Sequence, residues 1–179
     1  MITQQIIQQT RAFARQDGFF LSLVWIASFI GAMLAHKWPS LSLISFIFAI
    51  STPFVVSYTL KLFRDKALDG LISFRRAWFY AMETYFYATL ILTVVQFAYF
   101  EWGDTVGFMT QINESVKIAS EYYKQQGISA QEIKNMGEAL TMMSSAAWAS
   151  LFMIYELIFG CITSPIIALL MKRTTKITK

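Results

Sequence analysis

The sequence has little charge, one cysteine and one histidine. Asp, Glu, Lys and Arg make up 15% of its 179 residues, against roughly a quarter in ordinary soluble domains. The single Cys161 excludes an internal disulfide, and the single His36 excludes a site built from several imidazoles. The net charge of +4 is modest, and the basic residues do not alternate with aromatics on a polar surface, so we expect no nucleic-acid partner. The hydrophobic share of 56% instead indicates an integral membrane protein.

Four long apolar segments account for this hydrophobic character. Each reaches the length of about 20 residues that a helix needs to cross a bilayer. The first two contain no Asp, Glu, Lys or Arg, whereas the third contains Glu83 and the fourth contains Glu156. We therefore expect one all-α membrane domain, residues 1–179, in which four transmembrane helices form a four-helix bundle. The segments are residues 18–36, 41–60, 77–100 and 144–171.

Most basic residues lie on one side of these segments. They fall in the N-terminal tail (1–17), in the loop 61–76 and in the C-terminal tail (172–179). Because Lys and Arg favour the cytoplasmic side of a membrane, this distribution predicts a multi-pass protein with both termini in the cytoplasm. The exceptions among the 15 basic residues are Lys37, Lys117, Lys124 and Lys134.

Residues 101–143, on the outer side, show the pattern of an antiparallel helical hairpin. Apolar residues recur at three- and four-residue spacing up to Gly127, where we expect a left-handed cap closed by Ile128. Ser129 and Glu132 have the spacing of a capping box that starts a second helix, and Ile128 and Ile133 that of a hydrophobic staple. We expect this helix to continue into the fourth segment. The hairpin either covers the outer end of the bundle or docks a partner or lipid headgroups.

The first 17 residues predict a short interfacial helix. Ile6, Ile7 and Phe13 form an apolar side, and Arg11 and Arg15 lie opposite. This pattern suits a helix that lies on the cytoplasmic leaflet with its arginines near anionic headgroups.

Small residues recur within the segments, and such residues allow membrane helices to approach closely. The first segment has Ala27, Gly31 and Ala35, and the fourth has Gly160 and Ser164. We interpret these stripes as helix-packing positions, with the lining of a pore as the alternative.

Glu156 lies near the middle of the fourth segment. A carboxyl group at that depth is costly, so it should face the other helices and be either protonated or hydrogen-bonded. No Lys or Arg lies at similar depth, and the candidate partners are neutral. A structural, protonated glutamate and an ion or proton site are both open. The candidate partners are Gln96, Thr93, Thr52, Ser51 and Tyr155.

Glu83 lies closer to the cytoplasmic end, and we expect it to form an interfacial ion pair with Arg75, Arg76 or Lys61. The sequence contains none of the common hydrolase, zinc-protease, P-loop or dinucleotide motifs. We therefore expect no enzyme activity, no catalytic residue, no metal and no cofactor.

Three stretches resemble a known family. They are the run from Arg64 to Ala77 (RDKALDGLISFRRA), Gln96 late in the third segment, and residues 122–129 (YYKQQGIS). They are similar to a family of bacterial four-span inner-membrane proteins, common in Bacteroidota and catalogued as domain of unknown function 4199. Ala81 departs from the family, where a glycine is expected, and Glu156 matches no family motif.

The resemblance implies four spans in the bacterial cytoplasmic (inner) membrane and no assigned activity. It also implies an accessory role in envelope glycan or lipid assembly, beside a polyprenyl-phosphate glycosyltransferase. We accordingly expect a non-enzymatic accessory or scaffold subunit that binds membrane lipid, another membrane protein or a second copy of itself. The alternative is a small proton- or ion-coupled transporter that uses Glu156, although the two halves of the chain show no repeat.

Overall fold

The computed structural model describes residues 4–125 and 129–175, and within them the chain forms six α-helices. The four longest are long and apolar enough to cross a membrane. The described residues contain no strand and a single β-bridge, between Ile72 and Arg173. The all-α fold with four apolar helices and a helical hairpin is thus confirmed. The helices are α1 (Gln4–Leu34), α2 (Ser40–Ala67), α3 (Phe74–Trp102), α4 (Val106–Gln125), α5 (Ala130–Thr141) and α6 (Ser145–Met171).

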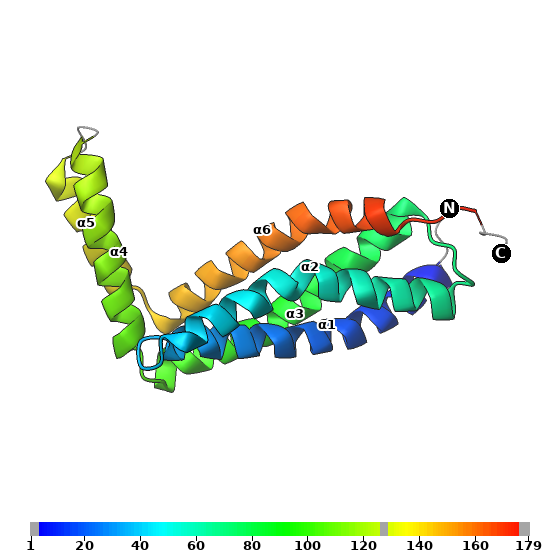
Figure 1. The fold of residues 1–179 in the computed structure, drawn as a ribbon, viewed down its shortest axis with the longest axis horizontal. Coiled ribbons are helices and arrows are strands. Elements are labelled where there is room, and N and C mark those ends of the chain that lie inside the picture. The colour runs from blue at the N-terminus through cyan, green and yellow to red at the C-terminus, as the bar shows by residue number, and fades with distance from the viewer. Residues whose placement is uncertain (1–3, 126–128, 176–179) are drawn as a thin grey trace.

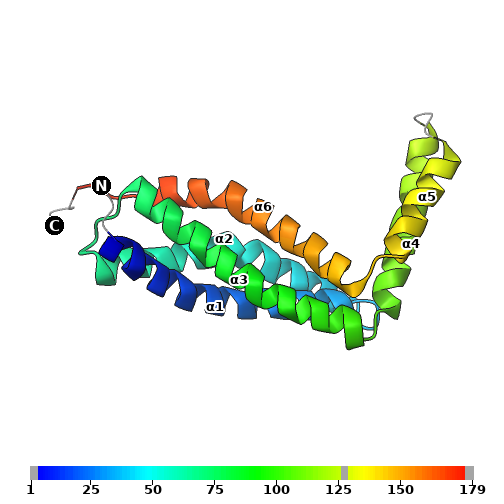
Figure 2. The same cartoon turned by 180° about the vertical axis from the view of Figure 1, so that it is seen from behind.

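The long helices α1, α2, α3 and α6 run side by side, with α3 packed along both α1 and α6. α2 packs against α1 and makes few contacts with α3 or α6. The start of α1, the α2–α3 loop and the end of α6 lie at one end of the molecule, and the α4–α5 hairpin lies at the other (Figure 1, Figure 2). The packing order α2–α1–α3–α6 therefore leaves a seam between α2 and α6.

Local sequence signals set several helix ends. Ser73, Ser129 and Ser144 each accept a hydrogen bond from a backbone N–H three residues later, and so cap α3, α5 and α6. The α2–α3 loop turns through two residues with positive φ, Asp69 at 50° and Gly70 at 81°. The hydrogen bond from the Glu132 N–H to the Ser129 side chain confirms the capping interaction that was expected at the start of the second hairpin helix. The expected cap at Gly127 and the Ile128 half of the staple lie outside the described residues.

The N-terminal segment is not a separate interfacial helix, contrary to the prediction. Residues 4–17 continue without a break into the first span as part of α1, and Thr10 and Ala14 are fully buried. Arg76 of α3 donates hydrogen bonds to the Gln9 and Thr10 side chains, at 2.7 and 3.1 Å. Because α3 extends as far as this segment, it supplies a protein surface on which the tail packs.

Glu83 has a different partner from the three expected. Its Oε1 lies 3.1 Å from Nε of Arg11, on α1. The continuity of α1 explains the error, since it places Arg11 beside α3 at the level of Glu83.

Helix packing uses only part of the predicted stripes. Gly31 is buried, and a Cβ built there would lie 3.2 Å from Cβ of Ser45 on α2. Ala27 is exposed, and Ala35 follows the end of α1, so these two do not continue a packing stripe with Gly31. Gly160 and Ser164 are both buried in α6, against α3.

A further glycine, Gly18, lies where α1 and α3 approach each other closely, and it was not among the predicted packing residues. A Cβ at this position would lie 2.8 Å from the carbonyl oxygen of Thr84 and 2.8 Å from Cβ of Tyr87. Close by, the Tyr80 hydroxyl donates a hydrogen bond to Asp17. The two helices are therefore in near backbone contact at this level.

The hairpin joins the long helices through the first turns of α4 and an aromatic cluster. Phe108 packs edge-on against Trp148 with ring centroids 4.9 Å apart, and Phe100 stacks on Trp148 at 6.0 Å. At the same end Lys37 donates a 2.9 Å hydrogen bond to Asp104, which lowers the pKa of that exposed carboxyl below its ordinary value.

Beyond this base the hairpin projects to the α6 side of the molecule (Figure 1). It therefore covers only part of this end of the long helices. α5 also ends at Thr141 rather than continuing into α6, because Ser144 caps a new helix and the chain changes direction there.

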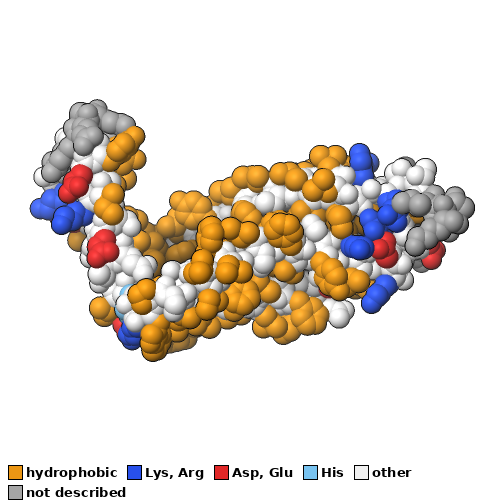
Figure 3. Space-filling model, in the orientation of Figure 1, with side chains coloured by type: hydrophobic (Ala, Val, Ile, Leu, Met, Phe, Trp, Pro, Cys, Tyr) orange, Lys and Arg blue, Asp and Glu red, His pale blue; other side chains and the backbone are white. Residues whose placement is uncertain are grey.

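The surface agrees with a membrane location. Hydrophobic side chains cover the length of the long helices, and Lys and Arg gather at the end opposite the hairpin (Figure 3). Large apolar residues are exposed along α2 in particular, where Leu43, Phe46 and Phe54 are 60–70% exposed. A surface of this kind suits contact with hydrocarbon rather than water.

Candidate functional site

Glu156 and Gln96 meet between α6 and α3. The Gln96 amide nitrogen Nε2 donates a hydrogen bond of 2.7 Å to Oε1 of Glu156. Gln96 is 1% exposed, whereas Glu156 is partly exposed. Among the neutral side chains expected as partners of Glu156, Gln96 is therefore the one that contacts it.

The two candidate threonines make other hydrogen bonds. Thr93 donates to the backbone oxygen of Thr89, one turn earlier in α3, at 2.8 Å. Thr52 of α2 accepts a 2.9 Å hydrogen bond from the indole Nε1 of Trp25 on α1. Thr52 and Trp25 nevertheless lie on the same groove as Glu156, whereas Thr93 does not.

This groove is the candidate site. It has a volume of about 470 Å³ and is lined by residues of α1, α2, α3 and α6. It lies at the seam where α2 and α6 make few contacts, in the half of the long helices nearer the hairpin. Its polar side chains are those of Trp25, Ser28, Thr52, Gln96, Tyr155 and Glu156, and the remainder are apolar.

Hydrogen bonds between α1 and α2 stabilise the side of the groove that these two helices form. The Ser28 hydroxyl lies 2.9 Å from the backbone oxygen of Ser45, and the Ser45 hydroxyl lies 2.6 Å from the backbone oxygen of Ser28. With the Trp25–Thr52 bond, they tie α2 to α1 rather than to α6. Trp25 and Ser28 were not among the predicted site residues. The signal available for Trp25 was its indole N–H, which needs an acceptor when it is buried inside a span.

Two buried polar atoms of the groove have no hydrogen-bond partner among the described residues. They are Oε1 of Gln96 and Oε2 of Glu156. A protonated Oε2 would offer a donor beside the free acceptor of Gln96, so the pair could bind a group that both donates and accepts, such as a hydroxyl or an amide. The groove thus combines apolar walls with one unsatisfied polar pair, a composition common in binding sites.

Few ionisable side chains line this groove. Glu156 is the only Asp, Glu, Lys, Arg or His among its lining residues. The described part of the chain contains no group of three or more His, Cys, Asp and Glu side chains placed to hold a metal ion. Tyr155, with its phenol group, is the other titratable side chain that lines the groove.

Comparison with known proteins gives one match. Neither the curated proteins nor the solved structures contain a match to this chain. The pattern of one protein family, described as "Protein of unknown function (DUF4199)", matches residues 16–173. The match spans all four long helices, the hairpin and the groove, and it agrees with the resemblance of the run 64–77. The chain therefore belongs to this family of proteins of unknown function.

Proposed function

We propose that this protein is a non-enzymatic accessory subunit of the bacterial inner membrane that binds a transmembrane helix of another protein along the α2–α6 seam. The observation that carries the proposal is the groove at this seam, with the unpartnered Gln96 and Glu156 oxygens inside it. Both oxygens are buried, so a hydroxyl or amide side chain of a partner helix would satisfy them after the Glu156 side chain turns toward the groove. Interhelical hydrogen bonds of this kind, together with close packing, hold membrane helices together.

The unequal burial of the four long helices supports a partner on this side. In the most apolar stretch of α2, 17% of residues are buried, and in that of α6 22%, against 39% in α1 and α3. α2 and α6 thus leave most of their surface for lipid or for another helix. The groove between them places the polar side chains of Thr52, Tyr155 and Glu156 at this surface.

The hairpin supports a protein rather than a lipid as the occupant. It projects on the α6 side, and hydrophobic side chains lie on its face toward the long helices, with charged side chains on the opposite face (Figure 3). A partner in the seam would therefore also meet the hairpin. Large hydrophobic residues are exposed on the hairpin and directly after it, among them Ile118, Met136 and Met142. The family resemblance favours an envelope glycan- or lipid-assembly enzyme, such as a polyprenyl-phosphate glycosyltransferase, as the partner.

Site-specific photo-crosslinking in living cells tests this proposal. We expect benzoylphenylalanine in place of Tyr155, which lines the groove, and in place of Met136, on the hairpin, to give an adduct with the same membrane protein. The control position is Val94, which is 68% exposed on α3 and lies outside the groove. A protein adduct from Val94 equal to that from Tyr155, or adducts with lipid alone from Tyr155, would contradict the proposal.

The transporter alternative has one specific observation in its favour, the unpartnered Oε2 of Glu156 in a groove. Against it stands the composition of the groove, in which Glu156 is the one Asp, Glu, Lys, Arg or His among the lining residues and Tyr155 is the other titratable side chain. The Glu156 substitutions described in the Discussion separate the two functions.

The proposed orientation, with both termini in the cytoplasm, has its own test. In a Cys161→Ala background, we expect Ser129→Cys to react with an impermeant thiol reagent added to intact spheroplasts, and Asp69→Cys to react only after lysis. The two positions lie at opposite ends of the long helices (Figure 1). Labelling of Asp69→Cys alone in intact spheroplasts would show that the molecule has the opposite orientation.

A further inference from the structure

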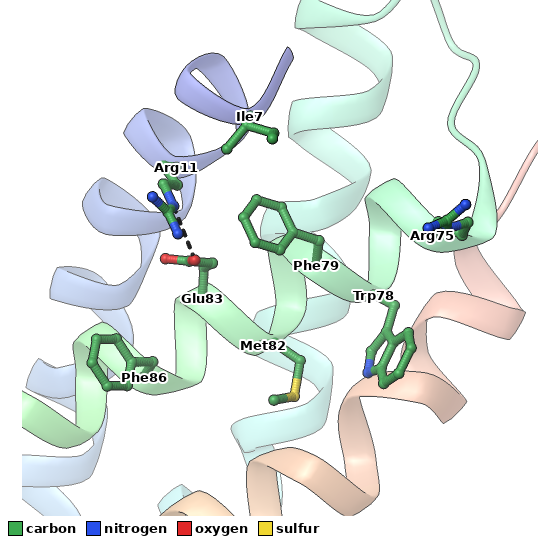
Figure 4. A pocket seen from close by; sticks show the side chains of 8 residues that line it. All are labelled: Ile7, Arg11, Arg75, Trp78, Phe79, Met82, Glu83 and Phe86. Atoms are coloured by element: carbon green, nitrogen blue, oxygen red, sulfur yellow. Dashed lines mark hydrogen bonds and ion pairs between the residues drawn. The ribbon is translucent and has the colours of Figure 1, made fainter. Parts of the chain in front are cut away.

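Two pockets meet at Arg75, at the end of the molecule opposite the hairpin. The larger has a volume of about 720 Å³ and lies between α1 and the first turns of α3 (Figure 4). The smaller, of about 490 Å³, lies beside the α2–α3 loop and the end of α6. Arg75 lines both pockets. The two pockets therefore border one another at this residue.

The smaller pocket is basic. Arg75, Arg76 and Arg173 line it, together with Ser73, and none of its lining residues is acidic. The β-bridge between Ile72 and Arg173 holds the α2–α3 loop against the chain that follows α6, and so keeps Arg173 near the start of α3. The positive end of the α3 dipole lies here as well, because α3 begins at Phe74. This combination suits an anionic group such as a phosphate.

The larger pocket is mostly apolar. Trp78, Met82 and Phe86 follow Arg75 at helical spacing and form a stripe along α3 that leads away from its basic start. The Trp78 indole is fixed by a 3.2 Å hydrogen bond to the Ser164 hydroxyl of α6. The stripe therefore forms a fixed apolar surface of the kind that a hydrocarbon chain covers.

Charge favours an anion over a neutral ligand. The two pockets together present four arginines and one acidic residue, Glu83, which is paired with Arg11 at 3.1 Å. The Arg11 guanidinium also lies over the Phe79 ring, 5.6 Å from its centroid. The Arg75 side chain is exposed and lies at the border between the basic pocket and the apolar stripe.

We infer that these two pockets bind one anionic phospholipid, with its phosphate at Arg75 and Arg173 and an acyl chain along Trp78, Met82 and Phe86. Basic pockets between membrane helices on the cytoplasmic side are known recognition sites for anionic headgroups. This site lies at the far end of the long helices from the groove, so it does not depend on the function proposed for the groove.

Native mass spectrometry of the full-length protein in mild detergent, with added phosphatidylglycerol or phosphatidylcholine, tests the inference. We expect the protein to retain phosphatidylglycerol preferentially. Arg75→Gln and Arg173→Gln should each weaken this retention about fivefold, the effect of one basic residue near a lipid headgroup. Lys66→Gln is the matched control, because Lys66 is exposed at the same end and lines neither pocket. It should leave retention unchanged.

Three outcomes would overturn the inference. Equal retention of phosphatidylcholine would show that charge is not recognised. A loss in Lys66→Gln equal to that in Arg75→Gln would show diffuse attraction to the basic end and no defined site. Displacement of the lipid by millimolar inorganic phosphate would show that the apolar stripe contributes nothing. Monodisperse elution and an unchanged melting temperature would establish that each variant is folded, so that a loss of lipid reports on the site.

Discussion

Gly18→Leu should force α1 and α3 apart and lower the free energy of unfolding by about 3 kcal/mol, the upper part of the range for overpacked sites. A Cβ at this position would already lie 2.8 Å from the backbone oxygen of Thr84. A backbone oxygen within a helix cannot rotate away as a side chain can, so the helix itself has to move. Reversible unfolding in mixed detergent micelles, followed by circular dichroism, would measure the loss.

Ala27→Leu is the matched control for this change. It adds the same side chain to the same helix, at a position that is exposed, so we expect the unfolding free energy to change by less than about 0.5 kcal/mol. Equal losses at Gly18 and Ala27 would contradict the close approach of α1 and α3. They would also show that Ala27 lies in a helix interface, as the small-residue stripe first suggested.

Glu156→Leu should destabilise the protein by about 1–2 kcal/mol, whereas Glu156→Gln should be nearly neutral. Leucine removes the acceptor of the 2.7 Å hydrogen bond from Gln96 and leaves a buried amide unpartnered. Interhelical hydrogen bonds in membranes average roughly 0.6 kcal/mol, and the unpartnered amide adds to this loss. Glutamine retains an oxygen that can accept the same bond.

A double substitution sharpens this test. Glu156→Leu combined with Gln96→Leu removes both partners, so it should recover most of the stability lost by Glu156→Leu alone. If the double variant loses the sum of the two single losses, the hydrogen bond is not what couples the two residues. The unfolding free energies of the four proteins would measure this coupling.

Substitution of Glu156 also distinguishes the accessory subunit from the transporter. In an accessory subunit, Glu156→Gln should retain partner crosslinking and cellular function, because it keeps size and hydrogen bonding. A proton- or cation-coupled transporter would lose its function with this single change while remaining folded in detergent. We expect Glu156→Gln to be tolerated. A folded but inactive variant would contradict that expectation and favour transport.

Some features were predictable because they depend on residues close together in the chain. The apolar length of each span sets the number of membrane-crossing helices, and Ser129 with the N–H of Glu132 starts α5 through contacts within one turn. The Glu156–Gln96 pair was among the expected contacts for a different reason. A carboxyl deep in a span has few polar groups at its own depth to meet, so composition alone limited the choice.

Other features depend on which helices are neighbours, and the sequence does not contain that information in local form. Arg11 forms an ion pair with Glu83 because α1 includes the N-terminal tail and packs on α3. The direction in which the hairpin projects also follows from packing. Phe108 and Trp148 hold the base of the hairpin against the long helices, whereas the rest of it projects to one side.

The sequence by itself determined the four apolar segments long enough to cross a membrane, the hairpin and the family, because hydrophobic length, capping residues and short motifs are properties of contiguous residues. The tertiary structure alone decided that α2 packs on α1 and leaves a seam with α6, which creates the groove around Glu156. It also brought Arg75 and Arg173 together beside an apolar stripe. Every face of a membrane helix is apolar enough to meet either lipid or protein, so hydrophobicity does not specify its neighbours. The close fit of small residues such as Gly18 and Gly160 against particular side chains specifies which helices pack together.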